Sequence, residues 1–347
     1  MKKRDDKGFT LIEVMVTLVI LIVVLTAVSG LFSLVLGQYK QQTKIAETGM
    51  ERMIGLEILR QDVAHAGHGL PWNGLSAAAY PEAASTTYND PPPNAPRAIL
   101  SGNNTGFGGS DRLIVKAASV GTDPLCRKWT LLDSTGATRA WTPASENPVA
   151  GNRVIVLEPG ATEDSRRSLV VVGANYSVDF AAVGGFAPLT PGDTRVVYGI
   201  DGGGALRMPY NRAEYYIDTT DVPETCAPNT GVLSKSLVSH ASGTLTTPLP
   251  LLDCVADFQV EFRLDGNGDG AIDGTSDDIT GPSYDARAIR AQVKEVRILI
   301  LAHEGQRDRS YDHPAGSITV AGHVNTVDRQ FRWRTYEMVV KPVNLGE

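Results

Sequence analysis

The chain has 347 residues, of which 42% are hydrophobic, and it contains 35 glycines and 20 prolines. This length and composition predict one large or two ordinary globular domains rich in loops, and they exclude a disordered chain. The formal net charge of −7 excludes a general electrostatic attraction to nucleic acid, so no nucleic-acid partner is expected.

The N-terminus combines a short basic segment with a long apolar one. Residues 1–8 include Lys2, Lys3, Arg4 and Lys7, and the stretch from Phe9 to Leu36 is almost wholly apolar. About 20 such residues span the core of a bilayer as a helix, so residues 9–36 are predicted to be transmembrane. The basic run predicts that the N-terminus stays cytoplasmic and that the remaining chain lies outside.

Three interpretations of this segment compete. A cleaved secretory signal would use Ala27-Val28-Ser29 as its cleavage site, but the apolar stretch continues past Ser29 and is longer than an ordinary signal core. A plain signal anchor fits the length. The third interpretation accounts for Glu13, an ionisable residue four positions into the apolar run.

A carboxylate within a membrane helix is costly, by about 2.5–3.5 kcal/mol at the helix centre and less near its end, and it calls for a cationic partner. If the chain is cut between Gly8 and Phe9, the new α-amine of Phe9 lies at the membrane depth of a neighbouring subunit's Glu13. Pairing these groups neutralises both charges when subunits stack.

The run Lys7–Val14 (KGFTLIEV) resembles the prepilin motif of type IV pilins and type II secretion pseudopilins. The resemblance implies that a prepilin peptidase cuts between Gly8 and Phe9 and methylates Phe9, and that Glu13 is the assembly residue. It also implies a single-pass inner-membrane protein whose body lies in the periplasm and then moves to the pilus or cell surface. Gly30 stands where many major pilins have proline, which favours a minor pilin.

The helix is expected to continue beyond the membrane. No break signal follows Leu36, and Met53, Leu56, Leu59 and Val63 recur on one helical face. Glycines and Pro71 then predict its end near residues 66–69. The expected organisation is therefore a leader at 1–8 and a helix at 9–69. His65 and His68 are interpreted as helix-end residues, with metal ligation as the alternative.

After the helix, the chain is predicted to be mainly β. Residues 70–110 are rich in proline and glycine and are expected to form a surface loop or linker. The body, residues 111–347, contains short β-like runs, and Val255–Leu264 alternates apolar with polar residues as a half-buried strand does. The expected fold class is α+β, with the long N-terminal helix packed on one extended antiparallel sheet region. The other expected strands are Arg112–Lys116, Arg153–Leu157, Ser168–Val172, Thr194–Ile200, Glu214–Ile217, Val293–Ala302 and Phe331–Val340.

Runs in the C-terminal third, at 251–258, 296–302 and 331–334, resemble the PilW-like branch of minor pilins, which is related to the large pseudopilin GspJ. The resemblance implies a minor pilin that initiates pilus assembly or forms part of a tip complex, in support of motility or adhesion. Its implied partners are other pilins and minor pilins, prepilin peptidase, the inner membrane and a tip adhesin.

The three cysteines are Cys126, Cys226 and Cys254. No C-x-x-C motif is present, so neither a zinc site nor a thioredoxin-type site is expected. If the body lies outside the cytoplasm, Cys226–Cys254 is the preferred disulfide because it closes a modest loop that leads into a strand. Three buried free thiols are the alternative.

The segment Asp265–Asp273 predicts a calcium loop. Asp265, Asn267, Asp269 and Asp273 occupy positions one, three, five and nine of an EF-hand-type loop, and a glycine follows at position six. Ala271 would offer its backbone carbonyl. Position twelve is Ser276 instead of glutamate, so Asp277 or Asp278 would have to close the site. The alternative is a solvated turn between two strands.

No nucleophile elbow, phosphate-binding loop, dinucleotide-binding glycine pattern or H-E-x-x-H motif occurs in the sequence. The expected function is therefore structural and not enzymatic, with a minor pilin as the leading hypothesis. A type II secretion pseudopilin is the alternative within the same class. From other classes, a membrane-anchored extracytoplasmic binding protein or a hydrolase remains the rival.

Overall fold

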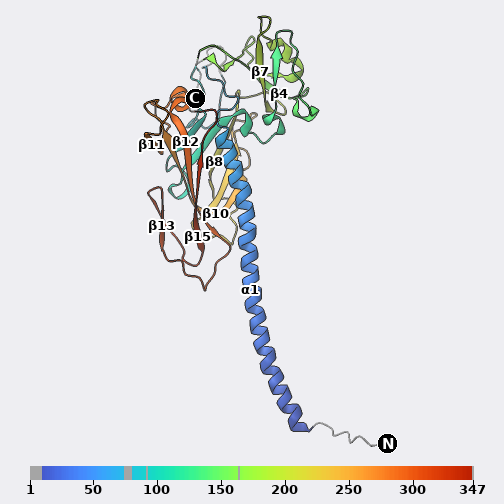
Figure 1. Cartoon of the computed structure of the whole chain (residues 1–347), viewed down its shortest axis with the longest axis vertical. Helices are drawn as coiled ribbons and strands as arrows, with labels where there is room; N and C mark the ends of the chain where they lie inside the picture. Colours follow the sequence, from blue (N-terminus) through green and yellow to red (C-terminus); the bar gives the residue numbers. More distant parts are fainter. Residues whose placement is uncertain (1–9, 74–79, 91–92, 163–164, 346–347) are drawn as a thin grey trace, which may run out of the picture.

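The computed structural model describes residues 10–73, 80–90, 93–162 and 165–345. A single long helix, α1 (Leu11–Ala64), extends from one end of a β-rich body (Figure 1). Its 54 residues correspond to a rod of about 80 Å at 1.5 Å per residue. This arrangement confirms the predicted α+β class, with a mainly antiparallel body on an N-terminal helix.

The end of α1 is fixed by backbone contacts with the body. The N–H of the cap residue His65 donates to the carbonyl of Gln61, and Gly67 then adopts a φ of 79°. This left-handed conformation costs glycine little. It turns the chain so that the N–H of Gly67 donates to the carbonyl of Lys116, 3.0 Å away, in the main sheet.

The main sheet is antiparallel throughout and has the strand order β1-β2-β8-β9-β10-β12-β15, with β11 added at the end of β10. Its longest strand, β10, pairs with β12 through a ladder that shifts register near each end, and β12 in turn pairs with β15. The strands are β1 (Ile99–Gly102), β2 (Arg112–Ala117), β8 (Asn211–Asp218), β9 (Gly231–Leu237), β10 (Leu249–Leu264), β11 (Gly274–Ser276), β12 (Val293–Glu304) and β15 (Arg332–Val340). A short helix, α2 (Ala286–Gln292), precedes β12.

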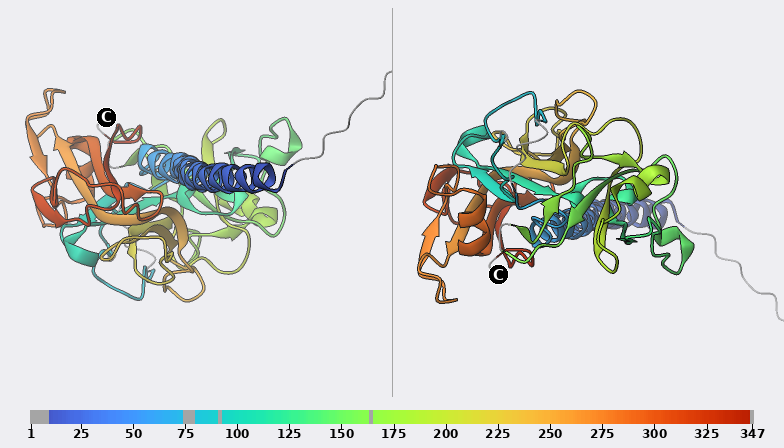
Figure 2. Two further views of the ribbon diagram at one scale, coloured as in Figure 1. Left: turned by 90° about the horizontal axis from the view of Figure 1, so that it is seen from below. Right: turned by 90° about the horizontal axis from the view of Figure 1, so that it is seen from above.

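A second antiparallel sheet has the order β3-β7-β4-β5, with β6 on β4, so the expectation of one extended sheet was wrong. Ile155 and Leu157 face the main core, whereas Val154 and Val156 face a separate core, which is why this sheet forms a lobe of its own. Both views of Figure 2 show it (green) on the side of the body opposite the C-terminal strands (orange and red). Its strands are β3 (Trp129–Asp133), β4 (Arg153–Glu158), β5 (Ser168–Leu169), β6 (Val178–Asp179) and β7 (Thr194–Asp201).

A hairpin formed by β13 (Ser317–Val320) and β14 (His323–Thr326) covers part of the main sheet. Val320 joins a small apolar cluster with Leu301 of β12 and Trp333 of β15. The opposite face of the sheet carries the main core, to which Leu59 and Val63 of α1 belong. The sheet is therefore covered on both faces along these strands.

The segment expected to be a surface linker, residues 70–110, is largely built into the body. It supplies β1, and the described residues Tyr80 and Tyr88 are buried. The ammonium of Lys116, fully buried on β2, lies 2.6 Å from Glu82 and 2.5 Å from Asp90. Such buried pairs hold a segment in place because separating them would leave a charge without a partner away from water.

Candidate functional site

The described part of the chain has one helical stretch that is long and apolar enough to cross a membrane, Leu11–Lys40. Its mean hydropathy is 2.9, and its most apolar part is not buried against the rest of the protein. Leu11 is 79% exposed and Leu31 is 65% exposed. This much apolar surface requires lipid or other subunits to cover it. At 1.5 Å per residue the stretch is about 45 Å long, close to the 40–45 Å of a bilayer with its headgroups.

Glu13 lies in the first turn of this stretch and caps its own helix. Its Oε2 accepts hydrogen bonds from the backbone N–H and from the hydroxyl of Thr10, both at 2.9 Å, and the N–H of Glu13 donates to Thr10 Oγ1 at 3.4 Å. This reciprocal arrangement is a capping box. It directs the carboxylate of Glu13 toward the N-terminal end of the helix.

The proposed cut between Gly8 and Phe9 lies outside the described residues. Thr10 follows Phe9 directly, so the carboxylate of Glu13 is hydrogen-bonded to the second residue after the predicted cut. No role was expected for Thr10 from the sequence. The signal was present, because threonine followed by glutamate three residues later before an apolar run is a capping-box pattern.

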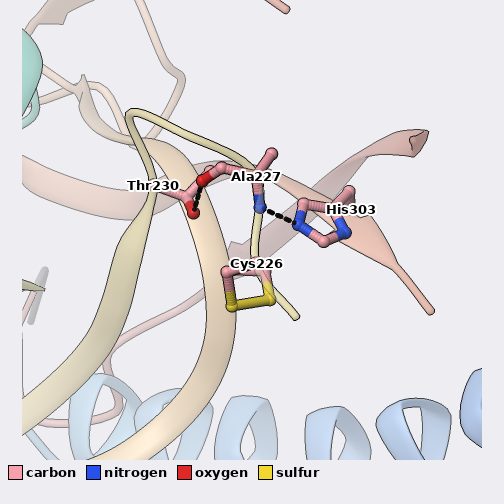
Figure 3. The surroundings of a disulfide bond; sticks show 5 residues. Cys226, Ala227, Thr230 and His303 are labelled. Carbon is pink, nitrogen blue, oxygen red and sulfur yellow. Dashed lines mark hydrogen bonds between the residues drawn. A yellow bond between two sulfur atoms is a disulfide. The ribbon is translucent and has the colours of Figure 1, made fainter. Parts of the chain in front are cut away.

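Cys226 and Cys254 form a disulfide with a Cα–Cα distance of 4.9 Å, which ties the loop before β9 to β10. The adjacent Ala227 donates its N–H to Nε2 of His303 at 2.8 Å, and the hydroxyl of Thr230 donates to the carbonyl of Ala227 (Figure 3). Burial lowers the pKa of His303 to about 4, so its ring is neutral at pH 7.

Among the described residues, this is the one group of three potential metal-ligating side chains whose ligand atoms lie within 4.8 Å of one another. The two sulfurs are bonded to each other and so have no thiolate to offer a metal. The group is therefore structural as it stands. The third cysteine, Cys126, is buried, and burial raises the pKa of its thiol to about 12.

The predicted calcium loop forms the tip of the β10–β11 hairpin and is wound around Asp265. One carboxylate oxygen of Asp265 accepts from the N–H groups of Gly268 and Asp269, at 2.7 and 3.2 Å, and the other accepts from Gly270 at 2.8 Å. Asp273 accepts from two N–H groups at the start of the loop. Although burial opposes it, the pKa of Asp265 is lowered by the N–H groups of Gly270 and Gly268 and by Lys294.

The other predicted ligands differ in position. Asn267 and Asp269 are exposed, and the amide of Asn267 donates to Asp269 at 3.2 Å. The ammonium of Lys294 lies 3.3 Å from Asp265 Oδ2 and already supplies a positive charge there. Asp277 does not join the other predicted ligands. Gly274 pairs with Leu264 at the mouth of the loop, and β11 then runs along β10 away from the loop before it reaches Asp277. Three residues of extended chain, roughly 10 Å, separate it from the loop.

Most of the predicted calcium ligands lie in one turn of the hairpin, but Asp265, Asp269 and Asp273 do not form a group whose carboxylate oxygens all lie within 4.8 Å of one another. Asp265, Asn267, Asp269 and Asp273 share one turn, and Ala271, whose carbonyl was expected to be a ligand, lies in the same turn with its N–H bonded to Asp269. The left-handed φ values of Gly268 (78°) and Gly270 (88°) allow this tight winding. Without Asp277 the predicted set has four side chains and one carbonyl, which is fewer than the six to eight oxygens that calcium takes.

The model of the prokaryotic N-terminal methylation motif matches residues 3–29 of the chain. Among solved structures, a type IV-like pilin from Thermus thermophilus aligns with 86% of this chain and 98% of its own, at 10% sequence identity and a TM-score of 0.36. No curated protein sequence matches.

The methylation motif, the exposed apolar helix that contains it and the antiparallel β body together define a type IV pilin-like protein. The motif and the helix fit anchoring of such a protein in a membrane. They also imply, in general terms, assembly with other pilins and processing by prepilin peptidase.

Proposed function

We propose that this chain is a minor pilin of a bacterial type IV pilus that acts in the initiation of assembly or in the tip complex. The observation that supports this most directly is the position of Glu13, which lies at the very start of an exposed apolar helix and within the residues matched by the methylation motif. The large body, with a second β lobe beside the main sheet, suits a subunit at the end of a filament. A type II secretion pseudopilin is the alternative.

In this mechanism, prepilin peptidase removes residues 1–8, and the amine of Phe9 pairs with the carboxylate of Glu13 in an adjoining subunit. The capping bonds from Thr10 hold that carboxylate at the N-terminal end of the helix before assembly. The body lies in the periplasm while the helix remains in the inner membrane, and it reaches the cell surface with the filament.

Glu13→Ala tests this role. We expect the variant to be processed normally but to be lost from sheared pili, because the amine of its neighbour would have no partner in an apolar environment. Glu57→Ala is the matched control, since Glu57 lies on the same helix beyond the apolar stretch and pairs with Arg60 in water. Incorporation of Glu13→Ala at the wild-type level, measured by immunoblot of the sheared fraction, would contradict the proposal.

We also propose that the Asp265–Asp273 loop binds calcium weakly and stiffens the hairpin. The winding of the loop around Asp265 supports this proposal, and the nearby Lys294 limits the affinity. Asp269→Ala should abolish any calcium-dependent rise in melting temperature, measured by calorimetry with calcium and with chelator. Asp193→Ala, an exposed residue just before β7, is the control. A calcium-dependent shift in the Asp269 variant equal to that of the wild-type chain would count against the site.

A further inference from the structure

A cavity of about 780 Å³ lies between α1 and the loop that follows β12. Its helix wall is formed by Ser33, Gly37, Gln38 and Gln42, and its loop wall by residues 306–310 together with Arg332 at the start of β15. We call it the helix–loop cavity. A Cβ added at Gly37 would meet nothing within 4 Å, so the space beside the helix is open at this residue.

The helix–loop cavity lies at one boundary of the apolar stretch. The stretch ends at Lys40, and the helix wall of the cavity spans residues 33–42. Because about 20 residues suffice for the hydrocarbon core, a helix that begins its span at Leu11 has these residues among the lipid headgroups. Figure 1 shows the lowest loops of the body beside the middle of α1 and not above it. Residues 306–310 therefore lie at headgroup depth.

The cavity is positively charged although the chain as a whole is acidic. Three arginines, Arg307, Arg309 and Arg332, line it together with one acid, Asp308. Asp308 is used by Arg332, at 3.0 Å, so it neutralises only that arginine.

The two remaining arginines are less neutralised, because Arg307 makes only a long ion pair and Arg309 has none among the described residues. Arg307 is 57% exposed, bonds to the neutral amide of Gln330 at 2.6 Å and lies 3.9 Å from Asp328. Arg309 is exposed and makes no hydrogen bond or ion pair with the part of the chain that the structure describes. Guanidinium groups suit phosphate because their N–H donors match its oxygens in pairs.

We propose that the helix–loop cavity binds the headgroup of an anionic phospholipid in the leaflet on the side of the body, with its phosphate between Arg307 and Arg309. The acyl chains of that lipid lie along the apolar face of α1, which continues directly from the cavity. The bound lipid fixes the body against the membrane surface before a subunit enters the filament. This inference rests on the membrane anchoring that the proposed function requires.

The test uses the full chain in lipid nanodiscs that contain spin-labelled phosphatidylglycerol or spin-labelled phosphatidylcholine. Electron paramagnetic resonance then gives the relative association of each lipid with the protein. Each arginine near a membrane surface favours anionic lipid by roughly fivefold at most. We therefore expect phosphatidylglycerol to associate with the protein more than about twofold more strongly than phosphatidylcholine does. The ratio of phosphatidylglycerol to phosphatidylcholine association should fall toward one in the double variant Arg307→Gln/Arg309→Gln. It should also fall toward one for the wild-type chain at high salt.

Arg127→Gln/Arg166→Gln is the matched control, because it removes two exposed arginines elsewhere on the body. It should keep the wild-type preference. The proposed lipid site would be overturned if the wild-type protein showed no preference for phosphatidylglycerol, or if both double variants showed the same preference. Neither result would contradict the membrane anchoring. A chain that does not insert into the bilayer at all would overturn the anchoring and the site together.

Discussion

His68 illustrates how burial decides the charge of a residue at the end of α1. Its ring packs edge-to-face against Tyr198, with 5.3 Å between the ring centroids. Burial, together with the positive charge of Arg167 and the nearby His65, lowers the pKa of His68 to about 4. His65 instead places its Nδ1 2.8 Å from the carbonyl of Gln61. The two residues are thus helix-end groups in different environments.

The lowered pKa of His68 predicts acid sensitivity. Below the unfolded pKa of about 6.5 the unfolded chain takes up a proton that the folded chain excludes, so stability is lost as the pH falls from about 6.5 to about 4. His68→Phe keeps the ring and removes the titration, and it should reduce this loss by at most about 3 kcal/mol. Urea unfolding at pH 7 and pH 4.5 measures the difference.

His303 provides the internal reference for this prediction. Burial lowers its pKa to about 4 as well, so part of the loss of stability at low pH should persist in the His68→Phe variant. If the variant lost as much stability as the wild-type chain between the two pH values, the ring of His68 would have to be protonated in the folded protein, and the account of its environment would be wrong.

The packing of α1 on the sheet depends on one very close approach. A Cβ built on Gly55 would lie 1.8 Å from the carbonyl oxygen of Leu251 on β10. On either side of this contact, Arg52 bonds to Glu304 and Tyr336, and Asp62 accepts from Lys235 and Tyr215. Gly55 thus allows the helix backbone to lie directly against the strand while charged pairs fix its rotation.

Gly55→Ala should therefore weaken the packing of α1 against the sheet. The added methyl group would force the helix away from β10, and we expect a loss of roughly 1–3 kcal/mol in the free energy of unfolding. Gly49→Ala is the matched control on the same helix, because a Cβ there would meet only the flexible end of Arg52, at 3.8 Å. That change should be neutral or stabilising by about 0.5–1 kcal/mol. Equal effects in chemical unfolding would contradict the close-contact explanation.

At the same scale, the sequence allowed some elements to be predicted and not others. The alternation of Val255–Leu264 and the apolar run at Val293–Ala302 indicated β10 and β12 because both depend on local pattern. Strand β9 was missed, since it carries Ser234, Lys235 and Ser236, all of them buried. Lys235 is tolerated there because it pairs with Asp62, a partner 173 residues away that no local pattern reveals.

At the scale of the whole molecule, the N-terminal helix could be predicted from the sequence more fully than the arrangement of the body. The motif around Glu13 is local, so the apolar helix could be predicted, and a role proposed for Glu13, from a short run of residues. The second β lobe and the helix–loop cavity could not, because each arises where segments distant in the sequence meet. The same applies to Asp277, which adjoins the predicted calcium loop in sequence but is carried away from it by the β10–β11 pairing.

The measurement that tests the central claim most directly is mass spectrometry of the N-terminus of the protein recovered from its native cells. The account predicts a mature chain that begins at Phe9 and carries one added methyl group on its α-amine. A chain that keeps Met1, or one cut at Ser29 so that it begins at Gly30, could not offer the amine of Phe9 to Glu13 of another subunit. Either result would contradict the assignment as a pilus subunit.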